Sequence, residues 1–209
     1  MHLTPMFANA IGWDRLNIDN KKIEDYCYAQ EAANPDIKKA LGWQSELIDL
    51  TAEPLSELVA EVKLKLQEMT GLYNIQDDYA PQLTTAWINI NKPNGRVLQN
   101  NVPHLHPGRF FSFVYYVKAE PNSGNLDLES PMRDLLGYAI PLQIYKGFNP
   151  FNSVKWTVTP EVGKMVIFPG WIKHHAGDNN SNSDRISIAF NADLQNLDKI
   201  YYPNRVDYK

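Results

Sequence analysis

Four of the five histidines in this 209-residue chain form two pairs, and their spacing suggests a metal site. His104 and His106 are separated by one residue, so on extended backbone both imidazoles point to the same face and can reach one ion. His174 and His175 point to opposite faces if their segment is extended, so only one can join the first pair. Three facial histidines leave about three positions open on an octahedral ion, as O2-activating iron requires. Structural zinc usually has four protein ligands.

A second group of polar residues alternates with apolar ones near the end of the chain. One face of this segment carries Ile186, Ile188 and Phe190, and the other carries Arg185, Ser187, Ala189 and Asn191. If the arginine face lines the interior, the guanidinium needs a partner, and a carboxylate ligand would bind its fork with two hydrogen bonds. The periodicity fits equally well with Arg185 on the solvent face.

The residues before about position 72 are expected to be helical. A helix is predicted from Asn17, a candidate N-cap, to about Asn34, where Pro35 would stop it. A stronger helical pattern runs from Pro54 to Thr70, with apolar residues at helical spacing. Thr51 is the candidate N-cap of this second helix, and Gly71 is its C-terminal stop.

The rest of the chain has the alternation and turn residues of a β protein. Strands are predicted at 83–90, 109–118, 125–129, 140–145, 154–159, 164–168 and 185–191. The predicted fold is α+β and mainly β, a jelly roll (double-stranded β-helix) with the N-terminal helices packed on the outside of one sheet. A single domain, 1–209, would comprise a helical N-terminal region (1–72), the core (83–191) and a C-terminal tail (192–209). The connection 130–141 is read as an ordinary loop in preference to a lid.

Composition indicates an ordinary globular chain. Apolar residues make up 44% and charged residues 21%, and the net charge of −4 argues against nucleic acid as the main partner. No signal peptide and no apolar run of membrane-spanning length is recognised, so a cytoplasmic location is predicted. The single cysteine, Cys27, cannot form an intrachain disulfide and is expected to be buried.

Four ordered motifs resemble the iron(II)- and 2-oxoglutarate-dependent oxygenases. They are HLHP (104–107), SFVYYV (112–117), GKMVIFPGWIKH (163–174) and RISIAFN (185–191), and WIN (87–89) fits upstream. The similarity is greatest to a branch from bacteria and bacteriophages in which an H-x-H-P element precedes SG-x-YY. It covers about residues 83–191.

The resemblance implies a role for several residues. His104 and His174 would be iron ligands, and Arg185 would hold the distal carboxylate of 2-oxoglutarate with help from Ser187 and the Tyr116 hydroxyl. Asn89 and Asn191 would belong to the pocket wall. The implied reaction uses O2 to convert 2-oxoglutarate to succinate and CO2, coupled to oxidation, usually hydroxylation, of a small-molecule or peptide substrate.

The middle ligand departs from the pattern of most of the superfamily. His106 stands where Asp or Glu is usual, as in the branch named above, and makes the metal site one unit more positive. Glu129 or Asp127 could serve in its place. His175 is expected at the rim, and His2 has no supporting context.

Two other functions are compatible with the sequence. A cupin-like three-histidine metalloprotein would share the jelly roll, but a glutamate expected soon after H-x-H is missing and Arg185 and Ser187 would have no role. An inactive jelly roll could serve as a binding or virion-associated module. The sequence does not indicate nucleic acid or membrane partners, it allows a homodimer, and a phage-encoded chain would act in the host cytoplasm. The loops 92–103, 119–124 and 130–153 carry no substrate signature.

Overall fold

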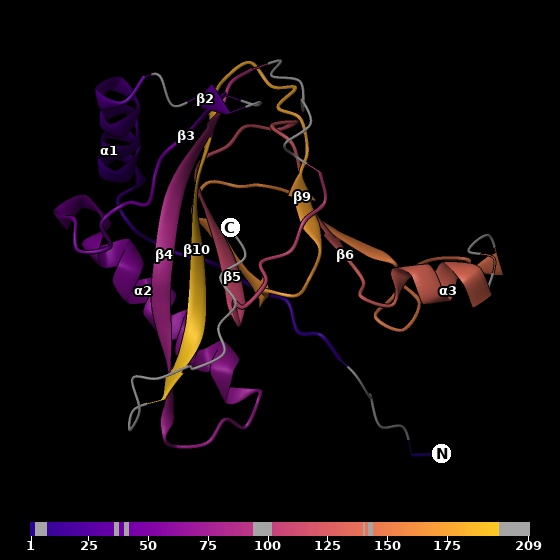
Figure 1. Ribbon diagram of the computed structural model, residues 1–209. Helices are drawn as coiled ribbons and strands as arrows, with labels where there is room; N and C mark the ends of the chain where they lie inside the picture. Colours follow the sequence, from indigo (N-terminus) through magenta and orange to yellow (C-terminus); the bar gives the residue numbers. More distant parts are fainter. Residues whose placement is uncertain are drawn as a thin grey trace.

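Two antiparallel sheets form the core of the computed structural model, which describes residues 1–2, 8–35, 38–39, 42–93, 102–139, 141 and 144–196 (Figure 1). The seven-stranded sheet has the order β1-β8-β5-β10-β4-β3-β2, and the three-stranded sheet has the order β7-β6-β9. The large sheet consists of β1 (Gly12–Arg15), β2 (Lys38–Lys39), β3 (Gly42–Gln44), β4 (Tyr79–Asn91), β5 (Phe111–Lys118), β8 (Lys164–Pro169) and β10 (Arg185–Asn196). The small sheet consists of β6 (Leu126–Glu129), β7 (Lys155–Val158) and β9 (His174–Ala176).

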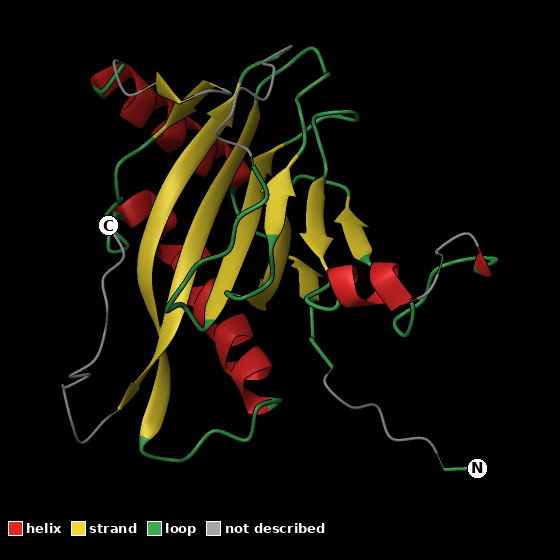
Figure 2. Cartoon of the chain, turned by 45° about the vertical axis from the view of Figure 1, so that its right-hand side comes forward, coloured by secondary structure: helices red, strands yellow, loops and turns green. Residues whose placement is uncertain are grey.

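The two long helices cover the face of the large sheet that points away from the small sheet (Figure 2). They are α1 (Asn20–Ala33) and α2 (Ser56–Gly71), which follows the short 3₁₀ helix η1 (Glu53–Leu55). Fully buried side chains such as Leu58 and Val62 of α2 pack in one core with Ile88 of β4 and Ile186 of β10. The expected α+β jelly roll with external N-terminal helices is confirmed.

A smaller core lies between the sheets. Leu126, Leu128 and Val158 of the small sheet pack against Tyr116, Val166 and Phe168 of the large sheet. The central strands of the large sheet are therefore buried on both faces, and they carry alternating sets of residues for two different environments.

Strand β10 shows which of its two faces points inward. Ile186, Ile188 and Phe190 belong to the helix-side core, whereas Arg185 and Ser187 lie between the sheets with 2% and 5% of their surface exposed. The orientation with Arg185 on a solvent face is therefore wrong. The periodicity did not distinguish the two orientations because both faces of this strand are buried.

Both helices begin later than the sequence predicted. Asp19 caps α1 in place of Asn17, and its carboxylate accepts hydrogen bonds from the backbone N–H groups of Lys21 and Lys22. Thr51 does not cap α2, because the 3₁₀ turn precedes that helix and the Thr51 hydroxyl donates to Asp49 at 2.7 Å. Gly71 is the last residue of α2, as expected.

Several predicted boundaries are corrected. The region before residue 72 also contains β1, β2 and β3, whose two to four residues are too few to show an alternating pattern. The segment 130–141 contains helix α3 (Arg133–Ala139). In the predicted strand 140–145, the described residues 141, 144 and 145 are not in a strand, and residues 140, 142 and 143 lie outside the described ranges.

The end of β10 and the short strand β9 also differ from the prediction. Strand β10 continues to Asn196 because its last residues pair with the first half of β4, so the expected tail begins later; 197–209 lie outside the described residues. Strand β9, three residues long, was not predicted as a strand. No helix in the described ranges is long and apolar enough to cross a membrane.

Gly42 offers a test of how β3 is held against β4. A Cβ atom at Gly42 would lie 2.1 Å from the Ile90 carbonyl oxygen, and the φ of +148° disfavours any side chain. We expect Gly42→Ala to lower the free energy of unfolding by about 1–3 kcal/mol in urea denaturation. Gly71→Ala is the control, because a Cβ there meets nothing within 4 Å, and it should be neutral or stabilising by up to about 1 kcal/mol. Equal losses in both variants would contradict the close approach of β3.

Candidate active site

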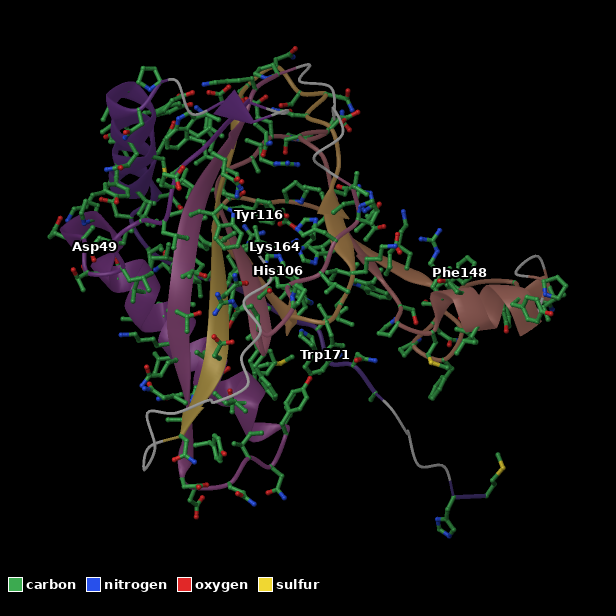
Figure 3. All side chains as sticks on the ribbon, viewed as in Figure 1. Asp49, His106, Tyr116, Phe148, Lys164 and Trp171 are labelled. Carbon is green, nitrogen blue, oxygen red and sulfur yellow. The ribbon has the colours of Figure 1, made fainter. Side chains whose placement is uncertain are left out.

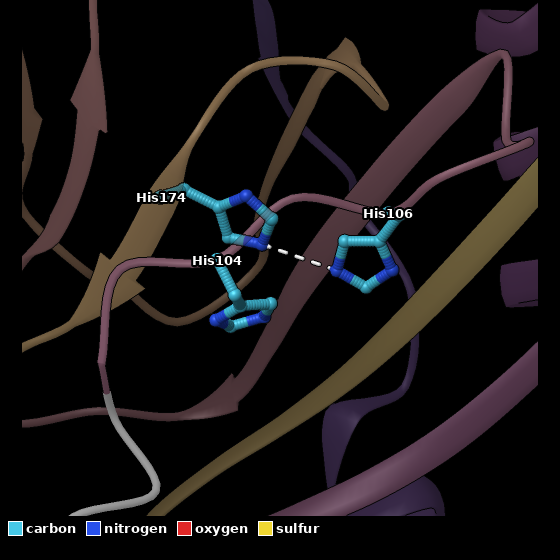
Figure 4. Close-up of side chains that lie close together, drawn as sticks. All are labelled: His104, His106 and His174. Atoms are coloured by element: carbon cyan, nitrogen blue, oxygen red, sulfur yellow. Dashed lines mark hydrogen bonds between the residues drawn. The ribbon is translucent and has the colours of Figure 1, made fainter. Parts of the chain in front are cut away.

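His104 and His174 are brought together by backbone hydrogen bonds. The His104 N–H donates to the His174 carbonyl at 3.0 Å, and the His174 N–H donates to the His104 carbonyl at 2.8 Å. The His106 N–H donates to the Gly170 carbonyl at 2.9 Å, which fixes the second histidine of the H-x-H segment beside the turn after β8. Residues 70 positions apart in the sequence thus converge on one point (Figure 4).

The three imidazoles have a spacing that suits a shared metal ion. One ring nitrogen from each of His104, His106 and His174 lies within 4.8 Å of the others, and the Nε2 atoms of His106 and His174 are 3.3 Å apart. Metal–nitrogen bonds of about 2.1 Å at right angles place two ligand atoms about 3 Å apart. The observed separation is close to that value.

Hydrogen bonds and burial keep these histidines in a form that can bind a metal. The Nδ1 atoms of His104 and His174 lie 3.1 Å and 2.9 Å from the carbonyl oxygens of Val102 and Ile172, so Nδ1–H donates and the Nε2 lone pair is left for an ion. Burial lowers the pKa of His106 to about 4 and that of His174 to about 3, with smaller contributions from neighbouring positive groups. Both rings are therefore neutral at neutral pH.

Trp87 supports the second histidine. Its ring stacks on that of His106 with the centroids 5.8 Å apart and the planes at 18°. Figure 3 shows His106 and Tyr116, both labelled, in the region between the two sheets. Trp87 is half-buried and lines the cavity wall.

A buried guanidinium lies in the same cavity as the histidines. Nη1 of Arg185 donates to the carbonyl oxygens of Ser123, Gly124 and Gly177 at 2.8, 2.7 and 3.2 Å, and Nη2 donates to Oδ1 of Asn91 at 2.9 Å. All four acceptors are neutral. Nε of Arg185 is buried and has no hydrogen-bond partner in the described structure. A carboxylate in this cavity would satisfy that donor.

Gly124 permits this arrangement. Its φ of +94° favours glycine, and a Cβ atom there would lie 2.3 Å from the Gly177 carbonyl oxygen and 2.6 Å from Nη1 of Arg185. Any side chain at this position would therefore displace either the loop or the guanidinium.

A polar row crosses the large sheet beside Arg185. Asn89 of β4, Ser187 of β10 and Tyr116 of β5 are register partners, so their side chains share one face. Burial raises the pKa of Tyr116 to about 12, against the opposing effect of the Arg185 charge, so the phenol remains a hydrogen-bond donor at neutral pH. All three line a cavity of about 200 Å³ together with Arg185 and the three histidines.

One predicted pocket residue is not brought to this cavity. Asn191 accepts a hydrogen bond from the Ser112 hydroxyl at 3.0 Å and donates to the Thr85 hydroxyl at 3.2 Å. It lies on the same face of β10 as Arg185 but six residues further along the strand, and it is not among the residues that line the cavity.

The alternative metal ligands lie away from the histidine cluster. Glu129 pairs with Arg133 at 2.6 Å, and Asp127 pairs with Lys155 at 2.9 Å. His175 points to the face of the small sheet that carries Asp127, with Nε2 3.6 Å from its carboxylate. His2 is exposed at the start of the chain.

Sequence reasoning missed two residues of the site. Asn91 contacts Arg185, and the run WININ (87–91) could have revealed it, because Trp87, Asn89 and Asn91 alternate with isoleucines. Gln44 lines the cavity from β3 and had no comparable signal, since that strand has only three residues.

The fold and site define a 2-oxoglutarate- and Fe(II)-dependent oxygenase. The sequence model of the family described as "Putative 2OG-Fe(II) oxygenase" matches residues 85–191, just over half of the chain, and the chain belongs to this family. It is therefore an enzyme whose cofactors are Fe(II) and 2-oxoglutarate, and the resemblance seen in the sequence is confirmed. Membership does not support the cupin-like or inactive alternatives.

Solved structures share the fold at low sequence identity. A prolyl-4-hydroxylase from Pseudomonas putida has a TM-score of 0.57 and 16% identity, over 88% of this chain and 92% of that one. The viral collagen prolyl hydroxylase of Paramecium Bursaria Chlorella virus-1, in its 2-oxoglutarate complex, has a TM-score of 0.54 and 11% identity, over 86% of this chain and 94% of that one. AviO1 from Streptomyces viridochromogenes Tue57 has a TM-score of 0.57 and 11% identity, over 89% of this chain and 90% of that one. The search of curated proteins found no match.

The low pKa values of the buried histidines predict how stability depends on pH. Histidine in the unfolded chain has a pKa of about 6.5, so between about pH 6.5 and 4 the unfolded chain binds more protons than the folded one. The free energy of unfolding of the metal-free protein should therefore fall as pH falls through this window, by up to about 1.4 kcal/mol per pH unit for each histidine. We expect His174→Gln to flatten that slope, measured by urea denaturation from about pH 6.5 to about pH 5. An unchanged slope would contradict the buried neutral form.

Proposed function

We propose that His104, His106 and His174 hold Fe(II), and that 2-oxoglutarate binds between this ion and Arg185. The observation that carries this proposal is a single cavity lined by three clustered imidazoles and by a buried guanidinium with an unpartnered Nε. The reaction would be the oxidation, most simply the hydroxylation, of an organic substrate.

The donor set suits a divalent ion that keeps open positions. Three imidazole nitrogens on one side leave room for a bidentate co-substrate and O2. The iron supplies the O2 activation that amino-acid side chains cannot provide. His106, held by stacking on Trp87 and by its backbone bond to Gly170, takes the position of the usual carboxylate.

The surroundings of Arg185 suit the distal carboxylate of 2-oxoglutarate. Three carbonyl oxygens tether Nη1 of Arg185, so Nε and the second hydrogen of Nη2 are left to donate to an anion. The protonated phenol of Tyr116 and the hydroxyl of Ser187 lie in the neighbouring row and would add hydrogen bonds. The charge balance also favours a dianion, since the described cavity lining includes no carboxylate.

The two asparagines would have different roles. We place Asn191 in support of the wall through its bonds to Ser112 and Thr85, and not in contact with 2-oxoglutarate. Asn89 is separated from Tyr116 by Ser187 in the polar row, so it would lie on the substrate side of the co-substrate.

The broader setting is also a proposal. We infer a single-domain enzyme of a bacterium or a bacteriophage, acting in the cytoplasm on a small molecule or a peptide, with a homodimer allowed. The buried unpaired thiol of Cys27 suits a reducing compartment. Two buried cores that share the large sheet support one domain.

Metal binding tests the ligand set. We expect the protein to bind one Fe(II), or Co(II) as a substitute. His106→Ala and His174→Ala should each weaken this binding by more than about tenfold, because even substitutions of residues that only support the ligands can lower metal affinity by that factor. His175→Ala is the matched control and should bind as the unmodified protein does. Isothermal titration calorimetry under anaerobic conditions measures both. If His175→Ala lost the metal and His106→Ala kept it, the assignment would be wrong.

Co-substrate binding tests the role of Arg185. Anaerobic Fe(II) and 2-oxoglutarate should give the metal-to-ligand charge-transfer absorption of chelated 2-oxoglutarate, and admitting air should yield succinate. We expect Arg185→Ala to weaken 2-oxoglutarate binding by more than about tenfold, the value of one lost charge-assisted hydrogen bond, with unchanged Fe(II) affinity. Arg185→Lys keeps the positive charge but lacks the paired N–H donors of the guanidinium. Its affinity for 2-oxoglutarate should therefore lie between those of the unmodified protein and Arg185→Ala.

The exposed Arg133 provides the control for this experiment. Arg133→Ala should bind both Fe(II) and 2-oxoglutarate as the unmodified protein does, because its partner is Glu129 on the small sheet. The proposed function would be overturned if the protein bound the metal but gave no charge-transfer absorption with 2-oxoglutarate and formed no succinate in air.

A further inference from the structure

A pair of carboxamide side chains on the large sheet has no role in holding iron or in the proposed contacts with 2-oxoglutarate. Gln44 of β3 and Asn89 of β4 are register partners, and Nε2 of Gln44 donates to Oδ1 of Asn89 at 2.8 Å. Both are half-buried and line the same cavity as the three histidines. We call them the amide pair.

The amide pair lies at the end of the polar row opposite Tyr116. The register runs from Gln44 through Asn89 and Ser187 to Tyr116, across β3, β4, β10 and β5. Tyr116 marks the end of the row proposed for the distal carboxylate of 2-oxoglutarate, and Arg185 lies two residues from Ser187 along β10. The amide pair is therefore separated from Tyr116 by strand β10, and beyond the pair only the two-residue strand β2 follows β3 in the described sheet.

The short strand β3 is held too firmly for Gln44 to be a loose surface residue. On one side of it, Trp43 is buried and its Nε1 donates to the Asn34 carbonyl at 2.8 Å. On the other, the Ser45 hydroxyl accepts from the Ile88 N–H at 2.8 Å, and the Ser45 N–H donates to the Ile88 carbonyl at 3.0 Å. A site that must orient a ligand needs this kind of support.

The amide pair offers hydrogen bonds of both kinds and no charge. Each carboxamide has two N–H donors and an oxygen with two lone pairs, and the mutual bond uses only one donor and one lone pair. Within the described structure, the side chains of the amide pair make no other hydrogen bond. A ligand group that both donates and accepts would complement them.

The surroundings favour an uncharged ligand group. The described lining of the cavity contains no Asp, Glu or Lys, and its one permanent charge is Arg185, whose guanidinium is held by Asn91 and three carbonyl groups and is assigned to the co-substrate. A charged substrate group beside the amide pair would lose its water without gaining a counter-charge, which is costly. A neutral amide would exchange its hydrogen bonds with water for equivalent ones.

The distance to the metal site is suitable for a substrate anchor. Asn89 and Trp87 are two residues apart on one strand face, roughly 7 Å, and Trp87 stacks on His106. The cavity of about 200 Å³ is smaller than the roughly 300–1,000 Å³ of pockets that enclose a drug-sized ligand. The substrate would thus insert one group while its remainder stays outside.

We propose that the amide pair is a substrate subsite that takes an uncharged amide, either a peptide group or a simple carboxamide. This inference rests on the proposed function, since it assumes that the reaction occurs at the histidine cluster. It assigns Gln44 and Asn89 to orienting the substrate so that a C–H bond near the bound amide faces the metal.

The test uses uncharged amides as probes of the Fe(II)- and 2-oxoglutarate-loaded enzyme. One set contains the N-acetylated, C-amidated forms of the common amino acids, and a second contains straight-chain primary carboxamides. The corresponding free amino acids and carboxylic acids form the charged comparison set. The measurements are succinate formation in air and the change in the charge-transfer absorption when each probe is added anaerobically.

We expect at least one uncharged amide to raise succinate formation several-fold above the probe-free rate, and its charged counterpart to have no effect. A response to the blocked amino acids alone would identify a peptide group as the ligand, and a response to the primary carboxamides would identify a simple carboxamide. Stimulation by the charged probes alone, or by none of the probes, would overturn the proposal while the charge-transfer absorption still supports the proposed function.

Two glutamine variants show whether the stimulation depends on the amide pair. Gln44→Ala should raise the KM for the active amide by about tenfold, the loss of one well-placed hydrogen bond, and leave the Kd of 2-oxoglutarate unchanged. Gln82→Ala is the matched control, because Gln82 is exposed on β4 and is not among the cavity-lining residues. If Gln44→Ala weakened 2-oxoglutarate as much as the amide, the amide pair would belong to the co-substrate site and the proposal would fail.

Discussion

The reciprocal backbone hydrogen bonds between His104 and His174 determine the geometry of the active site. They join the segment before β5 to strand β9 of the small sheet, and so connect the two sheets at the point where the imidazoles meet. Because these bonds are made by the main chain, they orient both side chains without using their ring nitrogens. The rings then need only one carbonyl acceptor each to present the Nε2 atoms together.

The large sheet serves two purposes because side chains alternate along every strand. On β4 and β10 the isoleucines form the core beneath the helices, and the residues between them form the floor of the cavity. The helices thus support the floor from behind, although they contribute no residue to the cavity lining. This explains how the large sheet can place several polar side chains with definite neighbours.

Much of this arrangement was accessible from the sequence. The histidine spacing and the alternation from Arg185 onward are local patterns, and their order along the chain carried the family resemblance. The contacts of Asn191 and the position of Gln44 were not accessible, because they depend on which strands are neighbours and on a strand of three residues. The apolar run 140–145 shows the opposite error, a strand predicted where none is observed. Its composition is typical of a β-strand, but Ile144 and Tyr145 do not belong to any strand of the structure.

The carbonyl groups around Arg185 act on it much as a hydration shell would. Oxygens of Ser123, Gly124 and Gly177 solvate the guanidinium with fixed dipoles, so hydrogen bonds from neutral groups stabilise the positive charge. Water molecules would have to be reorganised or expelled when an anion arrived, whereas these dipoles already have their final orientation. The missing side chain of Gly124 is what lets the main chain come close enough to replace that water.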